Sequence, residues 1–459
     1  MRWITRDKSF YRTLIALAIP VALQNLITFS VTMADNLMVS SLGDAAVSGV
    51  YMGGQVQTFL QMFSGGIEGA LLILAAQYWG KRDTASIKKI VAIGLQFSLL
   101  FGLVLTLAGL IFPRQIISLF TDKQEVIEQG IVYLRTVCFS YVFFCVTQSL
   151  IAAMRSVEVA RIGMVVSLIS LGVNVGLNYV LIFGKLGLPA MGIQGAALAT
   201  VISRAVETAV MVVYVGLKDK KLQLRLRDLL QSDSLLRKDF VKYGLPIVGG
   251  NVVWSINLMA NSAILGHLPG ADAVVTAASV ANTMNSLAYV TMNGMSSAVG
   301  IITGKTVGAG KTELMKEYAR TVQLLFLGVG LLTGGFITLM KNPFISLYTN
   351  ISPDAISLSR QFITVLSVTM IGTCYQAAGL FGLVKSGGDI SFVFRNDTIF
   401  VFLVVLPSAI LAAYLGAPAW VVFACLKCDQ ILKCFVAVVK INRFNWMKNL
   451  TRGGAQKAE

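Results

Sequence analysis

The stretch Pro20–Leu42 reads PVALQNLITFSVTMADNLMVSSL, and the related stretch PIVGGNVVWSINLMANSAILGHL follows 226 residues later at Pro246–Leu268. Both copies begin with proline, have asparagine five residues later and end in leucine. Among the positions where they differ is Asp35, which aligns with Asn261. After a two-residue insertion the match continues at Asp44 and Asp272, Gly66 and Gly294, Gly80 and Gly308, and Gln148 and Gln376. The repeat predicts two related halves, of which only the first keeps an ionisable group at this place.

Long apolar runs recur along the whole chain. Of its 459 residues, 56% are hydrophobic and 13% are charged, and the mean hydropathy is +0.74. Soluble domains carry about 25% charged residues, and a run of about 20 apolar residues is long enough to cross the hydrocarbon core of a bilayer. The sequence therefore predicts an all-α membrane protein. The short charged start, Met1–Lys8, leads into the first run without a small-residue cleavage site, so we expect no removable signal peptide.

We expect twelve transmembrane helices in two pseudo-symmetric six-helix lobes. An even number of helices in each half means that both halves insert in the same direction, related by an axis along the membrane normal. The expected spans are residues 13–41, 46–78, 87–112, 129–153, 159–183, 191–216, 243–266, 273–304, 317–340, 358–384, 391–413 and 417–440, with short amphipathic pieces at 113–128 and 342–359. The expected domains are an N-terminal lobe at 1–216, a basic linker at 217–242, a C-terminal lobe at 243–440 and a tail at 441–459.

The net charge of +16 is concentrated at one end of the expected helices. Lys and Arg lie in both terminal segments, in the linker and in the loop around Lys81 and Lys89, whereas the opposite loops, such as 269–271 and 416–418, carry none. The positive-inside rule then predicts a multi-pass protein of the cell membrane with both termini in the cytoplasm. Because topology accounts for the basic charge, we expect no nucleic-acid partner.

Two polar stripes predict a binding site in the first half. At 100° per residue the four polar side chains of the first helix fall within about 80° of one another, and a second stripe follows the fifth helix. The stripes consist of Gln24, Thr28, Thr32 and Asp35, and of Ser167, Ser170, Asn174 and Asn178. Asp35 lies about 10 Å from the outer end of its helix at 1.5 Å per residue, and Asn174, Asn178, Tyr133 and Thr200 come to similar depths.

A carboxylate inside an apolar helix is costly and is a functional-site hypothesis by default. One carboxylate among neutral oxygens suits Na⁺, a proton, or the ammonium group of an organic cation. For Ser167 and Ser170 we favour the simpler interpretation that they hydrogen-bond between packed helices. For Asp35 we favour the site.

A second set of charges falls within the last two spans, and its members are Asp397, Lys427, Asp429 and Lys433. Asp429 precedes Lys433 by four residues, which is the favourable order for a helical ion pair. We expect a charge-paired cluster that stabilises the second lobe, with a second cation site as the alternative. Arg204 and Glu207, three residues apart on the sixth helix, are interpreted in the same way as a structural pair, with a gate as the alternative.

Cysteines and histidine give no catalytic or metal-binding constellation. Cys425-x-x-Cys428 lies within a helix without a second pair, and the single histidine, His267, lies at a helix end. We interpret the cysteines as small packing residues. The chain also lacks HExxH and GxSxG. We expect no enzyme and no cofactor, and no metal beyond Na⁺ at Asp35.

Several motifs, taken in order, resemble the multidrug and toxic compound extrusion (MATE) family. They are the first-helix stretch from Pro20 to Asp35, the matching ends AAQYWGKRD and ITGKTVGAGK, the run NVGLNYVLIFG followed by GIQGAALATVISR, and the helix ends AAMRS and LVKSGGD. The resemblance covers nearly the whole chain. It implies an antiporter that works by alternating access, is driven by H⁺ or Na⁺, and exports amphipathic organic cations, including antibiotics. We expect the protein to be a monomer in the lipid bilayer.

The resemblance also implies roles for individual residues. Asp35 matches the first-helix acid of the family's N-lobe cation site, and Asn174 matches its fifth-helix asparagine. Tyr133 and Thr200 are the best matches for the fourth- and sixth-helix partners, while Asn178 stands where some members have a second aspartate. The seventh and tenth helices lack the carboxylates that some members have, so the resemblance does not extend to a cation site at these positions of the second lobe.

Three other classes of protein remain as alternatives. A lipid-linked saccharide or lipid flippase of the same superfamily would have a cationic cavity for anionic cargo, and usually more than twelve helices. A channel would need a ring of like charges at one depth, and an intramembrane enzyme a nucleophile with a base. A transporter fits the sequence best.

Overall fold

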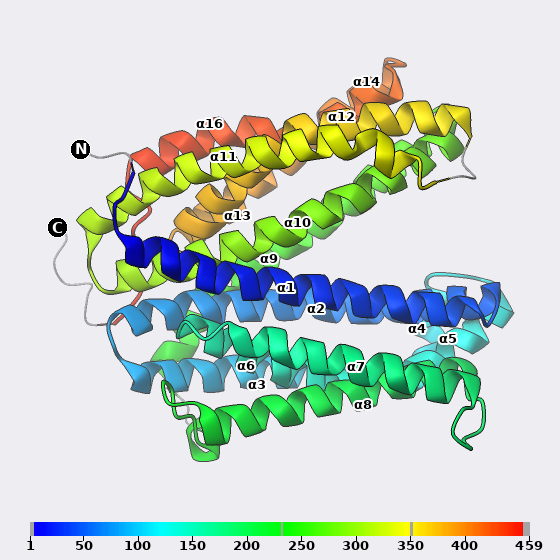
Figure 1. The fold of residues 1–459 in the computed structure, drawn as a ribbon, viewed down its shortest axis with the longest axis horizontal. Helices are drawn as coiled ribbons and strands as arrows, with labels where there is room; N and C mark the ends of the chain where they lie inside the picture. Colours follow the sequence, from blue (N-terminus) through cyan, green and yellow to red (C-terminus); the bar gives the residue numbers. More distant parts are fainter. Residues whose placement is uncertain (1–3, 231–232, 349–351, 453–459) are drawn as a thin grey trace. The chain divides into compact units, whose positions relative to one another are not determined.

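The computed structural model describes residues 4–230, 233–348 and 352–452, and within these ranges the chain is built from helices without a strand (Figure 1). Arg2 and Lys457, two of the terminal cations, lie outside them. The first-half helices are α1 (Lys8–Ser40), α2 (Asp44–Gly80), α3 (Thr84–Ile111), α4 (Pro113–Ser118), α5 (Gln124–Val137), α6 (Ser140–Ser156), α7 (Arg161–Phe183) and α8 (Gly192–Val213). The second-half helices are α9 (Ser234–Gly266), α10 (Ala271–Gly308), α11 (Thr312–Ile345), α12 (Pro353–Gln376), α13 (Ile390–Phe400), α14 (Leu406–Tyr414), α15 (Ala419–Leu426) and α16 (Asp429–Asn442).

Four short helical segments of other kinds complete the described chain. Three are π-helical and continue or join α-helices, and one is a 3₁₀ turn in the linker. They are η1 (Tyr214–Lys218), η2 (Leu226–Leu230, the 3₁₀ turn), η3 (Ala377–Lys385) and η4 (Val401–Val405).

The helix count agrees with the twelve spans expected from the sequence. Nine helical segments of the described chain are long and apolar enough to cross a membrane, and ten if α5 and α6, which meet at a 50° bend, form one span. The remaining two expected spans are α10 and the pair α15–α16. Polar residues such as Asn282, Asn285 and Asn293 lower the hydropathy of α10, and a break at Lys427 and Cys428 divides the last span. The prediction of an all-α membrane protein is confirmed.

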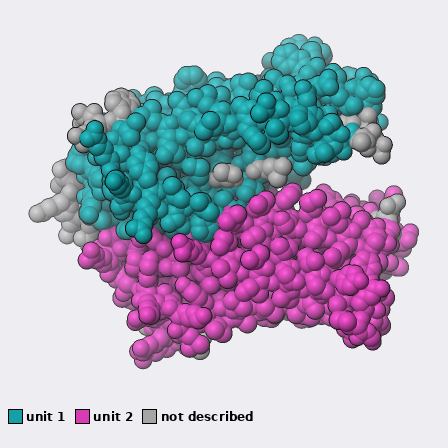
Figure 2. Space-filling model, in the orientation of Figure 1, with its two compact units in different colours: residues 1–22, 249–459 teal, residues 23–248 magenta. Residues whose placement is uncertain are grey.

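The chain forms two compact units, residues 23–248 and residues 1–22 with 249–459 (Figure 2). The boundaries fall inside α1 and α9, close after Pro20 and Pro246. Each unit therefore contains the first part of the helix that continues into the other unit. The lobes expected at 1–216 and 243–440 describe the sequence repeat, whereas the packed units exchange these two helix segments.

Paired glycines make room for the exchanged segments. A Cβ atom on Gly66 of α2 would lie 3.0 Å from Cα of Val248, in the part of α9 that belongs to the same unit. The equivalent Cβ on Gly294 of α10 would lie 2.7 Å from the carbonyl oxygen of Ala18 in α1. Both approaches are too close for a side chain, so each glycine of the repeat lets the exchanged helix pack directly on its partner.

Helix α9 begins at Ser234, nine residues before the start expected from hydropathy alone. These first turns are amphipathic, with Leu236 and Phe240 buried, and the Phe240 ring stacks on Phe97 at a centroid distance of 5.8 Å. The preceding linker is tied to α3, where Lys88 Nζ lies 3.0 Å from Asp228 Oδ2. The backbone N–H of Arg225 and the Lys88 side chain hold the pKa of Asp228 below its usual range.

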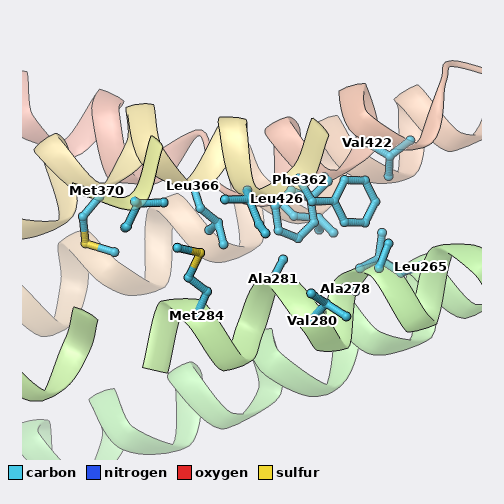
Figure 3. Close-up of a cluster of buried hydrophobic side chains, with 14 of the residues drawn as sticks. Leu265, Ala278, Val280, Ala281, Met284, Phe362, Leu366, Met370, Val422 and Leu426 are labelled. Atoms are coloured by element: carbon cyan, nitrogen blue, oxygen red, sulfur yellow. The ribbon is translucent and has the colours of Figure 1, made fainter. Parts of the chain in front are cut away.

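The core of the second-half unit gathers where α10, α12 and α15 meet (Figure 3). Phe362 of α12 and Phe423 of α15 stack with centroids 4.2 Å apart and rings 3° from parallel. Met284 of α10 and Met370 of α12 extend the same cluster. The first-half unit has a corresponding core around the fully buried side chains of Leu60, Leu134 and Tyr141. These cores fix the helices that carry the polar residues described next.

Candidate cation and substrate site

A cavity of about 310 Å³ lies within the first-half unit, between α1, α2, α5, α7 and α8. Six of the eight residues predicted for the N-lobe site line it, and these are Thr28, Thr32, Asp35, Tyr133, Asn174 and Thr200. Ser167 and Ser170 line it as well. Most of the polar residues in the stripes of α1 and α7 therefore face a common space, whereas Gln24 and Asn178 are not part of its lining.

The Asp35 side chain is positioned by a hydrogen bond from α7. Asn178 Nδ2 donates a hydrogen bond to Asp35 Oδ1 and a second, of 3.1 Å, to Asn174 Oδ1. Asn174 and Asn178 are 1% and 0% exposed, so α7 fixes both amides. Asn178 Oδ1 is buried without a hydrogen-bond partner among the described residues. A buried acceptor beside a carboxylate is of the chemical type that binds cations, although Asn178 itself does not line the cavity.

The neighbouring hydroxyl groups leave acceptor capacity for a ligand. Thr28 and Thr32 donate to the backbone carbonyls of Gln24 and Thr28, one turn earlier on α1, at 3.0 and 3.3 Å. Their oxygens keep lone pairs toward the cavity. Tyr133 approaches α2 at Gly53, where a Cβ atom would lie 2.7 Å from the ring, so glycine at this position admits the aromatic side chain.

The lining of the cavity contains a second acid that is already paired. Arg204 Nη1 lies 2.7 Å from Glu207 Oε2, and the Glu207 side chain is 2% exposed. The Arg204 guanidinium also lies over the Phe144 ring, 5.3 Å from its centroid. The geometry agrees with the structural pair expected from the sequence. Because the two charges cancel, Asp35 supplies the net charge of the cavity.

Gln24 lies apart from this group, although it belongs to the same stripe. Its side-chain oxygen accepts a hydrogen bond of 2.5 Å from Arg155 Nη2 at the end of α6. Eleven residues separate Gln24 from Asp35, which is about 16 Å along a helix. The polar stripe of α1 therefore extends from the cavity at Asp35 to the end of α6 at Gln24.

Sequence reasoning missed the contribution of α2. Several polar residues of this helix line the cavity, and they include Tyr51, Gln55 and Thr58. Their spacing of four and three residues places them on one helical face. This periodicity is present in the sequence, but hydroxyl and amide side chains at this spacing also suit hydrogen bonding between packed helices.

The charges of the second-half unit form a compact network. Lys433 Nζ lies 2.9 Å from Asp397 Oδ1 and 3.0 Å from Asp429 Oδ2, and all three side chains are less than one-fifth exposed. Gln430 Nε2 donates to Asp429 at 3.2 Å. Lys427 forms no ion pair with them among the described residues, and its ammonium lies 5.8 Å from the centre of the Phe423 ring. The pairing supports a structural interpretation of this network for three of its four expected members.

Comparison with known proteins agrees with the motifs. The family described as MatE matches residues 20–180 and 246–416, which are the two halves of the repeat. The probable multidrug resistance protein NorM of Thermotoga maritima is 26% identical over 79% of each chain. The multidrug resistance protein MdtK of Edwardsiella ictaluri is 26% identical over 88% of this chain and 87% of its own.

Solved structures share the fold. A multidrug resistance MATE family transporter in an outward-facing conformation superposes with a TM-score of 0.80 at 20% identity, over 96% of this chain and 99% of its own. A MOP superfamily transporter from Pyrococcus furiosus, described as having a binding pocket of reverse polarity, superposes with a TM-score of 0.84 at 19% identity, with the same coverage of both chains. At these identities the likeness concerns the fold alone.

Proposed function

This chain is a member of the multidrug and toxic compound extrusion (MATE) family, and on that premise we propose that it is a multidrug efflux antiporter that exchanges organic cations for H⁺ or Na⁺. The protein is accordingly a transporter of the cell membrane and not an enzyme. The orientation that we propose has both termini in the cytoplasm, as the distribution of Lys and Arg favours. We propose a monomer with no cofactor other than the coupling ion.

The observation that carries this proposal is the Asp35 carboxylate. It lines the cavity beside neutral oxygens, and no described Lys or Arg forms an ion pair with it. A carboxylate in this setting binds an ammonium group or a small hard cation. Tyr51 and Tyr133 add aromatic surface to the same cavity, which suits the apolar part of an amphipathic cation through cation–π contact.

In the mechanism that we propose, ion and substrate compete for Asp35. The ionised carboxylate holds the organic cation, and H⁺ or Na⁺ displaces it when the binding site opens to the outside. The Asn178 side chain orients the carboxylate throughout, because its amide donates to Asp35 and is held by α7. For Na⁺ we propose a further oxygen from Asn178 Oδ1, which has no hydrogen-bond partner among the described residues. Exchange then follows because one acid cannot hold both cations at once.

The charge of the cavity favours this function over a flippase for anionic, lipid-linked cargo. Such cargo requires excess positive charge around its phosphates. Among the described residues, Arg204 is the only Lys or Arg in the lining of the cavity, and Glu207 neutralises it.

The test uses everted membrane vesicles and a fluorescent cationic dye, driven in separate experiments by a pH gradient and by a Na⁺ gradient. The wild-type protein is expected to transport dye into the vesicles under at least one gradient. Asp35→Asn should reduce transport to the background of vesicles without the protein, while its abundance in the membrane is unchanged. Asp122→Asn, an exposed acid in the loop after α4, is the matched control and should transport normally. Normal dye transport by Asp35→Asn would overturn the proposal.

A further inference from the structure

A long groove of about 780 Å³ runs along the second-half unit between α11, α12, α15 and α16. It is separate from the Asp35 cavity, since every residue that lines it belongs to residues 249–459. Several of its apolar side chains are open, including Val368 at 53% and Leu432 at 41% exposed. In a membrane-spanning helix bundle, such a surface faces hydrocarbon chains.

The lining of the groove changes from polar to apolar along its length. Lys341 lies four residues before the end of α11, and Arg360 lies in the second turn of α12, so both are near the loop that joins these helices. Val368 is eight residues deeper on α12, about 12 Å along the helix. Ile431 and Leu432 of α16 continue the apolar part. The groove therefore has a cationic end and a mainly apolar deeper part, in which Thr369 and Cys428 are the exceptions.

The two cations are available to a ligand. Lys341 Nζ donates a hydrogen bond of 3.0 Å to Thr364 Oγ1, which holds the ammonium at the groove. Neither Lys341 nor Arg360 forms an ion pair with a carboxylate among the described residues, and the lining contains no acid. Trp420, 44% exposed at the start of α15, lies at the same end. Trp, Lys and Arg together are typical of the level of the lipid headgroups.

The apolar face of the groove is not needed for the core of the unit. Phe362, Leu366 and Met370 of α12 point into the buried cluster with α10 and α15 (Figure 3). Val368 lies on another face of the same helix and is half exposed. The groove is therefore lined by side chains of α12, such as Val368, that do not belong to this core.

We propose that this groove binds a phospholipid with an anionic headgroup. The lipid phosphate lies between Lys341 and Arg360, and an acyl chain lies along Val368 and Leu432. Basic pockets between membrane helices recognise anionic lipids in this way, because the cations attract the phosphate and the apolar wall accepts the chain. The binding itself is independent of the transport proposal. Lys341 lies at the end of α11 opposite its basic first turns, so the orientation proposed above places this lipid in the outer leaflet. That assignment alone rests on the proposed function.

The experiment is native mass spectrometry of the protein after reconstitution with equal amounts of phosphatidylglycerol and phosphatidylcholine. The wild-type protein is expected to retain phosphatidylglycerol in preference to phosphatidylcholine. Removing both cations in Lys341→Gln/Arg360→Gln should lower this preference by roughly five- to thirty-fold, since each cation near the headgroups contributes about fivefold. The control Lys123→Gln/Lys185→Gln removes two exposed loop cations and should retain the wild-type preference.

Two further variants keep the test decisive. Arg360→Gln alone changes an exposed residue and should lose part of the preference even where the double variant folds poorly. Ala424→Trp fills the groove and should reduce the retention of both lipids. Equal retention of the two lipids by the wild-type protein, or an unchanged preference in the Lys341→Gln/Arg360→Gln variant, would overturn the proposal. A dimer mass that excludes lipid would assign the groove to a second copy of the chain and overturn it as well.

Discussion

Replacing Lys433 with glutamine is expected to destabilise the second-half unit more than the loss of one hydrogen bond would. Lys433 lies within 3.0 Å of both Asp397 and Asp429, and its side chain is only 7% exposed. Without the ammonium, two neighbouring carboxylates remain buried and repel each other. Removing one partner of a buried ion pair costs about 3–5 kcal/mol, and at about 2–4 °C per kcal/mol for a unit of this size the Tm should fall by roughly 6–20 °C.

A second substitution in the same network should restore part of the lost stability. Lys433→Gln with Asp397→Asn leaves only Asp429, which still accepts a hydrogen bond of 3.2 Å from Gln430 Nε2. The double variant should therefore melt above Lys433→Gln, which is the opposite of additive behaviour. Thermal unfolding of the purified protein in detergent gives both values. Lys123→Gln, an exposed lysine, is the control and should stay within about 0.5 kcal/mol of the wild-type protein.

Two results would refute this reasoning. One is a Lys433→Gln variant with the Tm of the wild-type protein. The other is a double variant whose loss of stability equals the sum of the two single losses. Dye transport distinguishes the alternative, because a structural network leaves transport per folded molecule unchanged in Lys433→Gln/Asp397→Asn. Loss of transport without loss of stability would instead identify a second cation site.

Two further predictions concern the second-half unit. In Gly372→Ala the new methyl group would overlap the backbone carbonyl of Gln430, so α12 and α16 must separate; we expect a loss of about 1–3 kcal/mol or more, measured by thermal unfolding against Gly335→Ala, where the space is open. The second prediction is a pH dependence that comes from Asp389. Burial raises the pKa of Asp389, but Lys440 and Lys448, each 2.7 Å away, outweigh burial and hold this pKa below its usual range. Its stabilisation is therefore fully present above a pH of about 4 and is lost as the pH falls through the lower folded-state pKa. The difference in Tm between the wild-type protein and Asp389→Asn should shrink over this acid range, and a difference independent of pH would contradict the assignment.

Periodicity and depth were sufficient to predict much of the candidate site. Asp35, Asn174 and Asn178 meet because α1 and α7 carry polar residues at one helical spacing and at one level. Gln24 satisfied the angular criterion and still lies elsewhere, bound to Arg155, because an angle on a helix does not fix position along it. A polar stripe therefore predicts a shared site only for residues that match in depth along the helix as well as in angle around it.

The interruptions of the helices could not be predicted from the sequence. The segment Ala377–Lys385 is π-helical although it contains no proline, and the last span breaks at Lys427, where the following turn begins the ion-pair network. These irregularities follow from packing between helices that are distant in the sequence. Likewise, the polar residues of α2 could be assigned to the cavity only when its neighbours were placed, because the same spacing also suits helix–helix hydrogen bonding.

The boundaries of the units within α1 and α9 have a consequence for how the protein can be divided. A cut in the linker would separate the two copies of the repeat, but neither fragment would contain a complete unit, because each would carry a helix segment that packs in the other. Gly66 and Gly294 pack directly against these segments, so each fragment would expose a helix surface that a segment of the other fragment normally covers. We therefore expect the two fragments to be stable only when produced together. A destabilising mutation in the first turns of α1 should lower the stability of the second-half unit, and one in the first turns of α9 that of the first-half unit.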